Sequence, residues 1–104
     1  MGTDPVTKMG RAMSEQNHRK LLTLVIEESA EVMQEICKML HFGLDNVNPV
    51  TGVSNQEKLH AEVGDVLAVL EMMVDRGYLD WDKLQAGAER KVERLKKWHP
   101  DLFN

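Results

Sequence analysis

The residues best suited to chemistry are glutamates on one side of a predicted helix. Segment 24–40, LVIEESAEVMQEICKML, contains Glu27, Glu28, Glu31 and Glu35. At about 100° per residue these side chains fall within an arc of roughly 100°, and Lys38 lies on the same side. Glu28 and Glu31 are three residues apart, so their charges repel unless a cation lies between them. Most such clusters are solvated surfaces, so this segment alone does not identify a metal site.

A second pair of carboxylates changes that interpretation. Glu62 and Asp65 lie three residues apart, inside the apolar stripe of the next predicted helix. An ionised carboxylate on an inward face is strongly unfavourable unless it is paired or bound to a metal. If the two acidic faces meet, four carboxylates converge, and a hard divalent cation is the simplest way to neutralise them. The predicted ligands of Mg²⁺, or of Mn²⁺ as a substitute, are Glu28, Glu31, Glu62 and Asp65. The alternative is a set of buried ion pairs to Lys20, Lys38, Lys91 and Arg94.

Three helices position these residues, and no strand pattern of useful length appears. The first begins after Ser14 and runs to about His41, where Gly43 suits a left-handed stop. Ser54 and Glu57 form a capping box before a second helix that ends near Gly77. The third helix follows Asp80, runs over 81–98, and ends at His99-Pro100. Segment 44–53 between the first two is a loop, with room for a flap near a site.

The third predicted helix should bury Leu84, Ala88, Leu95 and Trp98. Lys91 points into the middle of that face, and the same helix is the only basic segment of the chain. Residues 1–13 have no sustained periodicity and are expected to form a loose arm or a remnant of an expression tag. Residues 14–104 then form one all-α domain, a bundle of three main helices.

Composition narrows the classes of function. The net charge of −4 argues against nonspecific coating of a nucleic-acid polymer. Cys37 is the single cysteine, so an internal disulfide is excluded; a small core residue in a reducing cytoplasm is the expectation. No apolar run approaches the length of a membrane span, so no membrane partner is expected.

The acidic motifs also resemble a known superfamily. Glu27-Glu28-x-x-Glu31, followed by Glu62-x-x-Asp65, looks like the signature of the MazG-like all-α nucleoside triphosphate pyrophosphatases. That group includes MazG, dimeric dUTPases, dCTP pyrophosphatases and phosphoribosyl-ATP pyrophosphohydrolase. The tail Glu93–Phe103, ERLKKWHPDLF, is similar to the end of a MazG domain. The resemblance covers roughly residues 18–103, although the gap between the two motifs is somewhat longer than is usual in the family.

The resemblance implies hydrolysis of an NTP or dNTP between the α and β phosphates, in nucleotide-pool house-cleaning. It places the metal on the four carboxylates named above, with Glu27 as a further acid that orients water or holds a second ion. The predicted catalytic residues are Glu27, Glu28 and Lys91. The predicted substrate-binding residues are Lys38, Lys91, Arg94 and Trp98. Phe42, Trp98 and either Asn46 or Asn48 are candidates to stack on the base or to read it.

Other interpretations remain. A phosphoribosyl-ATP pyrophosphohydrolase is the main rival for the substrate, and a non-catalytic assembly module with buried ion pairs is the main rival for the function. A di-iron or di-manganese bundle is disfavoured, since it needs Glu-x-x-His motifs and His60 points to the opposite face. The apolar stripes are broader than one chain can cover. A homodimer or homotetramer that completes a four-helix-bundle-like core is therefore expected, with the active site near the subunit interface.

Overall fold

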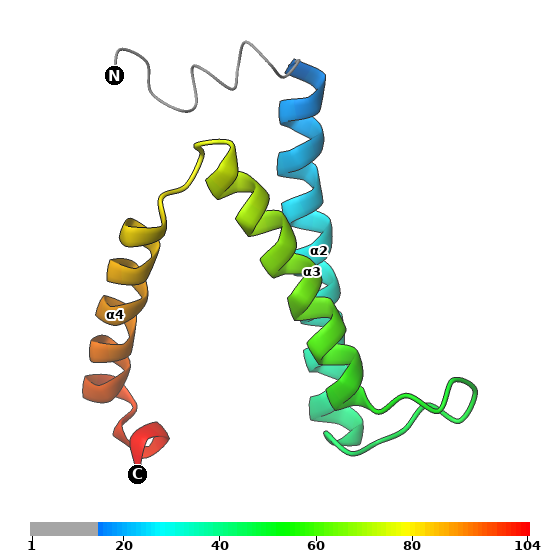
Figure 1. Cartoon of the computed structure of the whole chain (residues 1–104). Helices are drawn as coiled ribbons and strands as arrows, with labels where there is room; N and C mark the ends of the chain where they lie inside the picture. Colours follow the sequence, from blue (N-terminus) through cyan, green and yellow to red (C-terminus); the bar gives the residue numbers. More distant parts are fainter. Residues whose placement is uncertain (1–14) are drawn as a thin grey trace, which may run out of the picture.

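The computed structural model describes residues 15–104, and three helices dominate it (Figure 1). They are α2 (Glu15–Phe42), α3 (Asn55–Asp75) and α4 (Trp81–Trp98), followed by a short 3-10 helix, η1 (Pro100–Phe103). This part of the chain has no strand, only an isolated antiparallel bridge between Val47 and Ser54. The predicted all-α class is therefore confirmed. The predicted arm over 1–13 and the Ser14 cap lie outside the described residues.

The helices begin and end where local chemistry predicts. The Ser54 hydroxyl accepts a hydrogen bond from the Glu57 backbone N–H (3.1 Å). The Asp80 carboxylate accepts one from the Lys83 N–H (3.1 Å). After α2 the chain turns at Gly43, where φ is +96°, a value that a residue with a Cβ rarely adopts. Its N–H donates to the Met39 carbonyl (2.8 Å), which satisfies one of the last carbonyls of the helix.

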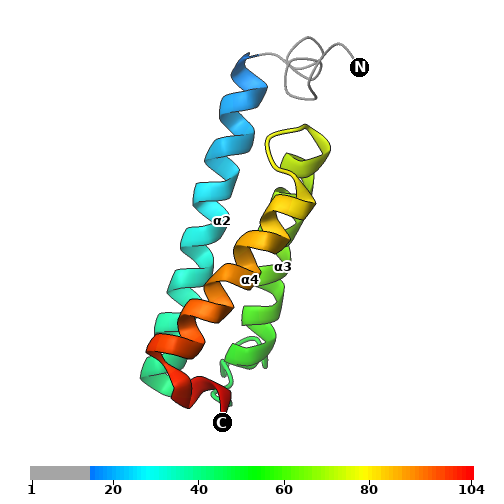
Figure 2. The same cartoon turned by 90° about the vertical axis from the view of Figure 1, so that its left-hand side faces the viewer.

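α2 and α3 form an antiparallel hairpin whose helices pack along their length (Figures 1 and 2). Its small apolar core lies near the start of α2 and the end of α3, where Leu21 and Val69 are buried. The partly buried residues around them are Leu24, Val25, Met73 and Tyr78. Towards the other end of the hairpin, carboxylates replace this apolar packing.

The 44–53 segment is an ordered loop that closes on the start of α3. The Asn48 side-chain oxygen accepts from the N–H groups of Val50 (2.8 Å) and Thr51 (3.2 Å). The backbone N–H of Asn55 donates to the Asn46 carbonyl (2.9 Å). These bonds give Asn48 a structural role, which makes it a weaker candidate for reading a base.

α4 diverges from the hairpin instead of packing against it (Figure 1). Consequently no residue of α4 is buried. The predicted buried face is wrong for a single chain: Leu84 and Leu95 are partly buried, whereas Ala88 and Trp98 are exposed. Lys91 is exposed as well, because the inward face that it was expected to occupy has no neighbour.

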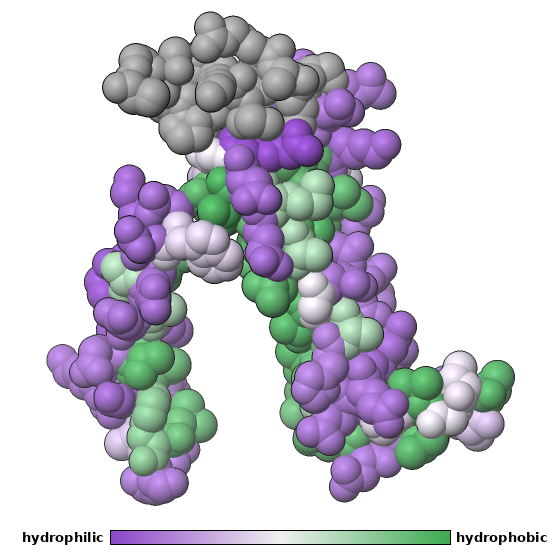
Figure 3. All heavy atoms as spheres, in the orientation of Figure 1, coloured by the Kyte–Doolittle hydropathy of each residue, from purple (hydrophilic) through white to green (hydrophobic). Residues whose placement is uncertain are grey.

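Much of the apolar stripe of α2 is also uncovered. α3 packs against the boundary between the acidic side and the stripe, where Leu21 and Glu35 are buried. The stripe beyond this boundary stays exposed at Leu22, Ile26, Met33, Ile36 and Leu40. Cys37, predicted to be a core residue, is exposed for the same reason. Hydrophobic residues also gather on the flank of the hairpin that faces α4 (Figure 3).

Candidate metal centre

The acidic sides of α2 and α3 meet midway along the hairpin. Glu28 and Glu31 come from α2, and Glu62 and Asp65 come from α3. One carboxylate oxygen from each residue lies within 4.8 Å of the corresponding oxygens of the other three. The spacing of three residues on both helices produces this convergence, because it places each pair on one face of its helix. The four residues that the sequence singled out are thus brought together.

The four carboxylates differ in burial. Glu62 is 6% exposed and Glu28 is partly buried, whereas Glu31 and Asp65 are exposed. The expectation that Asp65 lies on an inward face is therefore wrong for one chain, and Asp65 forms the open rim of the cluster. A centre with one buried side and one open side can hold an ion and still admit a substrate.

The contacts within the cluster raise the pKa of Glu31. A hydrogen bond to Glu62 and the nearby charges of Glu28 and Glu62 raise the pKa of Glu31 to about 7. The pKa of Glu62 is lowered instead, because Lys58 and Glu31 both donate hydrogen bonds to it. The metal-free cluster thus favours a proton on Glu31, at a position where a cation would replace it.

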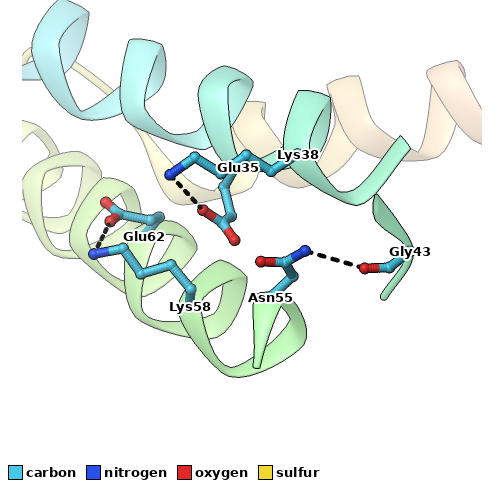
Figure 4. A network of polar contacts seen from close by, with 6 residues as sticks. All are labelled: Glu35, Lys38, Gly43, Asn55, Lys58 and Glu62. Atoms are coloured by element: carbon cyan, nitrogen blue, oxygen red, sulfur yellow. Dashed lines mark hydrogen bonds and ion pairs between the residues drawn. The ribbon is translucent and has the colours of Figure 1, made fainter. Parts of the chain in front are cut away.

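Lys58 is a member of the site that the sequence analysis missed. Its Nζ lies 2.8 Å from Glu62 Oε1, and this contact raises the pKa of the lysine (Figure 4). The signal in the sequence is the spacing of four residues between Lys58 and Glu62, which places the two on one face of α3. Lys58 neutralises one carboxylate and leaves most of the negative charge of the cluster uncompensated.

The alternative of buried ion pairs fits these contacts poorly. Within residues 15–104, none of Lys20, Lys91 and Arg94 forms an ion pair with the cluster. Lys38 pairs at 3.9 Å with Glu35, which lies outside the set of four. Glu28 Oε2 and Glu62 Oε2 are buried without a hydrogen-bond partner, a costly state for carboxylate oxygens.

The donor set fits a hard divalent cation. All four donors are carboxylate oxygens, which Mg²⁺ and Mn²⁺ prefer. Two oxygens on opposite sides of Mg²⁺ are about 4.2 Å apart at ordinary bond lengths. The observed spread of up to 4.8 Å is close to that separation. The residues that would hold the ion are therefore Glu28, Glu31, Glu62 and Asp65.

Comparison with known protein families agrees with this geometry. Residues 16–103 match the family described as the MazG nucleotide pyrophosphohydrolase domain. The chain belongs to this family. No significant match was found among the curated proteins or among the solved structures. Within residues 15–104, no helix combines the length and the hydropathy needed to cross a membrane.

Not every predicted site residue of the MazG domain lies at the cluster. Glu27 is exposed on α2 and is not among the converging carboxylates. Lys91, Arg94 and Trp98 lie on α4, which does not pack on the hairpin within one chain. Trp98 is 69% exposed, and Lys97 Nζ lies 5.3 Å from the centre of its ring.

A cleft of about 460 Å³ opens beside the carboxylates, between the end of α2, the 44–53 loop and the start of α3. Its lining includes four residues that the sequence analysis had named as candidates for binding the substrate: Lys38, Phe42, Asn46 and Asn48. It also includes Glu35 and Asn55, two buried polar residues that the sequence analysis had not assigned (Figure 4). Their burial could not be read from the sequence, because Glu35 is buried where α2 packs on α3 and Asn55 is buried where its side chain bonds back to Gly43.

The raised pKa of Glu31 predicts a pH-dependent stability for the metal-free MazG domain. Its pKa is 4.5 in the unfolded chain and about 7 when folded, so the folded state holds more protons between these values. This contribution to the free energy of unfolding is complete below 4.5 and is lost as the pH rises through 7. In EDTA, the Tm is therefore expected to be higher at about pH 5 than at about pH 8.

Mg²⁺ should raise the Tm most at the higher pH, because there it need not displace the proton. Thermal scans monitored by circular dichroism, with and without Mg²⁺, measure both effects. Glu31→Gln is the matched control, since it removes the titrating group. A pH dependence that is identical in Glu31→Gln would contradict the assignment.

Proposed function

We propose that this chain is a magnesium-dependent nucleoside triphosphate pyrophosphohydrolase. It hydrolyses an NTP or dNTP between the α and β phosphates and releases the monophosphate and pyrophosphate. The observation that carries the proposal is the convergence of Glu28, Glu31, Glu62 and Asp65, which leaves two buried carboxylate oxygens without partners. Membership of the MazG family supports the reaction class. Nucleotide-pool house-cleaning in a reducing cytoplasm is the proposed setting.

In this mechanism the four carboxylates hold the ion at the junction of α2 and α3. When bound, Mg²⁺ lowers the pKa of water and offsets the charge that develops on the phosphates. Glu28 has a buried oxygen without a partner, and it accepts the proton of the attacking water. Glu27, one residue away, is the further acid proposed to orient that water. Lys58 keeps Glu62 ionised by holding its carboxylate at 2.8 Å.

The cations of the hairpin near the site, Lys38 and Lys58, are each paired with a glutamate, so the substrate phosphates need further cations. Lys91 and Arg94 are exposed on α4, and neither forms an ion pair within the described chain. We propose that they bind the phosphates in a homodimer or homotetramer, in which α4 packs against the hairpin of another subunit. Lys38 lines the cleft beside the cluster and extends the phosphate site towards the nucleoside.

Direct product analysis tests the proposed reaction. Purified protein is incubated with each of the eight common NTPs and dNTPs, with Mg²⁺ or with EDTA. Monophosphate and pyrophosphate in equal amounts are expected from at least one nucleotide, and only with the metal. Nucleoside diphosphate with inorganic phosphate would indicate cleavage between the β and γ phosphates instead. Failure to release pyrophosphate from any of the eight would favour the non-catalytic assembly module.

A further inference from the structure

Glu35 is the most buried carboxylate among residues 15–104, and it is not one of the proposed metal ligands. Only 2% of the residue is exposed. Its Oε2 lies 3.9 Å from Lys38 Nζ, whereas its Oε1 is buried without a hydrogen-bond partner. A buried acceptor in this state is costly, since it has lost water and gained nothing in return. A donor that arrives with a ligand would satisfy it.

Asn55 places a second acceptor opposite this oxygen. Its side-chain Nδ2 donates to the Gly43 carbonyl at 3.1 Å, and only 8% of the residue is exposed. Because that bond fixes which end of the amide faces Gly43, the amide oxygen is turned towards Glu35 (Figure 4). Neither oxygen can donate to the other, so the pair is complementary to a group that carries two N–H bonds.

Both residues line the cleft of about 460 Å³ beside the carboxylate cluster. Along α2, Glu35 is one turn beyond Glu31, or about 6 Å at the ordinary helical rise. Along α3, Asn55 is two turns before Glu62, or about 10 Å. A nucleotide with its α-phosphate at the cluster can therefore extend its ribose and base into this cleft. Phe42 lies on the same lining and is 63% exposed as a residue, so its ring is available to stack on a base.

We propose that this cleft binds the base of the substrate, and that Glu35 and Asn55 select an exocyclic amino group. Glu35 Oε1 accepts one hydrogen of the amino group, and Asn55 Oδ1 accepts the other. The favoured bases carry this group at position 4 of a pyrimidine or position 6 of a purine, as in cytosine and adenine. Uracil and thymine present a carbonyl oxygen there, which would face two further acceptors. The inference rests on the proposed pyrophosphohydrolase function.

The test compares nucleotides of nearly the same shape that differ in this group and in the adjacent ring nitrogen, which is an acceptor beside the amino group and an N–H donor beside the carbonyl. The value of kcat/KM is measured for dCTP against dUTP, and for dATP against dITP, the hypoxanthine analogue. Each amino nucleotide is expected to be favoured by about 10-fold to 100-fold over its keto partner, the range for a paired base contact. Glu35→Gln should bring both ratios close to unity, because the new amide can donate to Asn55 and no longer requires a donor from the ligand. Glu71→Gln, an exposed acid on α3, is the matched control and should keep the wild-type ratios.

A binding measurement keeps the inference testable if Glu35→Gln does not fold. Calorimetry of the wild-type protein with the products dCMP and dUMP reports base selection without turnover, and tighter binding of dCMP is expected. Equal binding and equal kcat/KM within both pairs would overturn the base assignment while leaving the hydrolase proposal intact. The same holds if Glu35→Gln keeps the ratios and only weakens Mg²⁺ binding, which would make Glu35 a metal ligand. An absence of activity on every nucleotide would reject the hydrolase proposal itself.

Discussion

Glu62→Gln is expected to abolish magnesium-dependent release of pyrophosphate. Glu62 is the most buried of the four converging carboxylates, and one of its oxygens has no partner other than the ion it is proposed to bind. The loss in kcat/KM should exceed about 100-fold, because even residues that only orient metal ligands are worth 10- to 100-fold. Pyrophosphate assays over a range of Mg²⁺ concentrations measure the effect, and calorimetry of Mg²⁺ binding shows whether the ion is lost.

Asp65→Asn separates the loss of the ion from a loss of the fold. Asp65 is exposed and is not paired with Lys58, so its replacement leaves the Lys58–Glu62 contact in place. We expect the same loss of activity, with unchanged helical circular dichroism. In EDTA the Tm should stay constant or rise, because one of several repelling charges is removed. Full activity in both variants would rule out the four-carboxylate centre, and Glu71→Gln serves as the neutral control.

The helices and the metal cluster could be predicted because both depend on interactions that are close in sequence. Ser54 and Asp80 cap their helices through bonds to residues three positions away. The cluster needs only two motifs of fixed spacing and an antiparallel hairpin to join them. Such a hairpin is the simplest way to pair two long amphipathic helices joined by a loop of about ten residues.

The remaining site residues depend on contacts that spacing alone does not specify. Asn55 begins α3, and a helix N-terminus gives no reason to expect a buried amide bonded to Gly43. Glu35 falls on the acidic side of α2, and its spacing does not indicate that it is buried where α2 packs on α3. For Lys91 the prediction is wrong in the opposite direction, because the residue was expected on an inward face and is exposed. The periodicity of α4 indicates an inward face but does not say whether that face packs against the same chain or another one.

The shape of the single chain is relevant to which chain the inward face of α4 packs against. Its extents are 52 × 40 × 15 Å, so the chain is flat, with one extent far shorter than the other two. Stable domains usually consist of at least two packed layers around a core. Here Leu21 and Val69 are the only buried apolar residues in the described part of the chain. A second layer supplied by another copy would cover the stripe of α2 and the hydrophobic flank that faces α4 (Figure 3).

We therefore expect sedimentation equilibrium at micromolar concentration to give at least twice the 11.9 kDa mass of one chain. Ile26 is 70% exposed in the single chain, so Ile26→Glu should leave the isolated helix hairpin intact. At a symmetric interface the same change occurs twice. Losing the burial of two isoleucines at about 1.5 kcal/mol or more each should weaken the dimer by about 100-fold or more.

Pyrophosphate release should decrease as the dimer dissociates. Lys91 on α4 is proposed to bind the substrate phosphates beside the carboxylates of another subunit. Gln34→Glu adds the same charge on the polar side of α2 and should preserve both mass and activity. If Ile26→Glu behaves like Gln34→Glu, the stripe around Ile26 is not the interface. If the wild-type protein is an active monomer of 11.9 kDa, one chain completes the site alone and α4 must close onto its own hairpin.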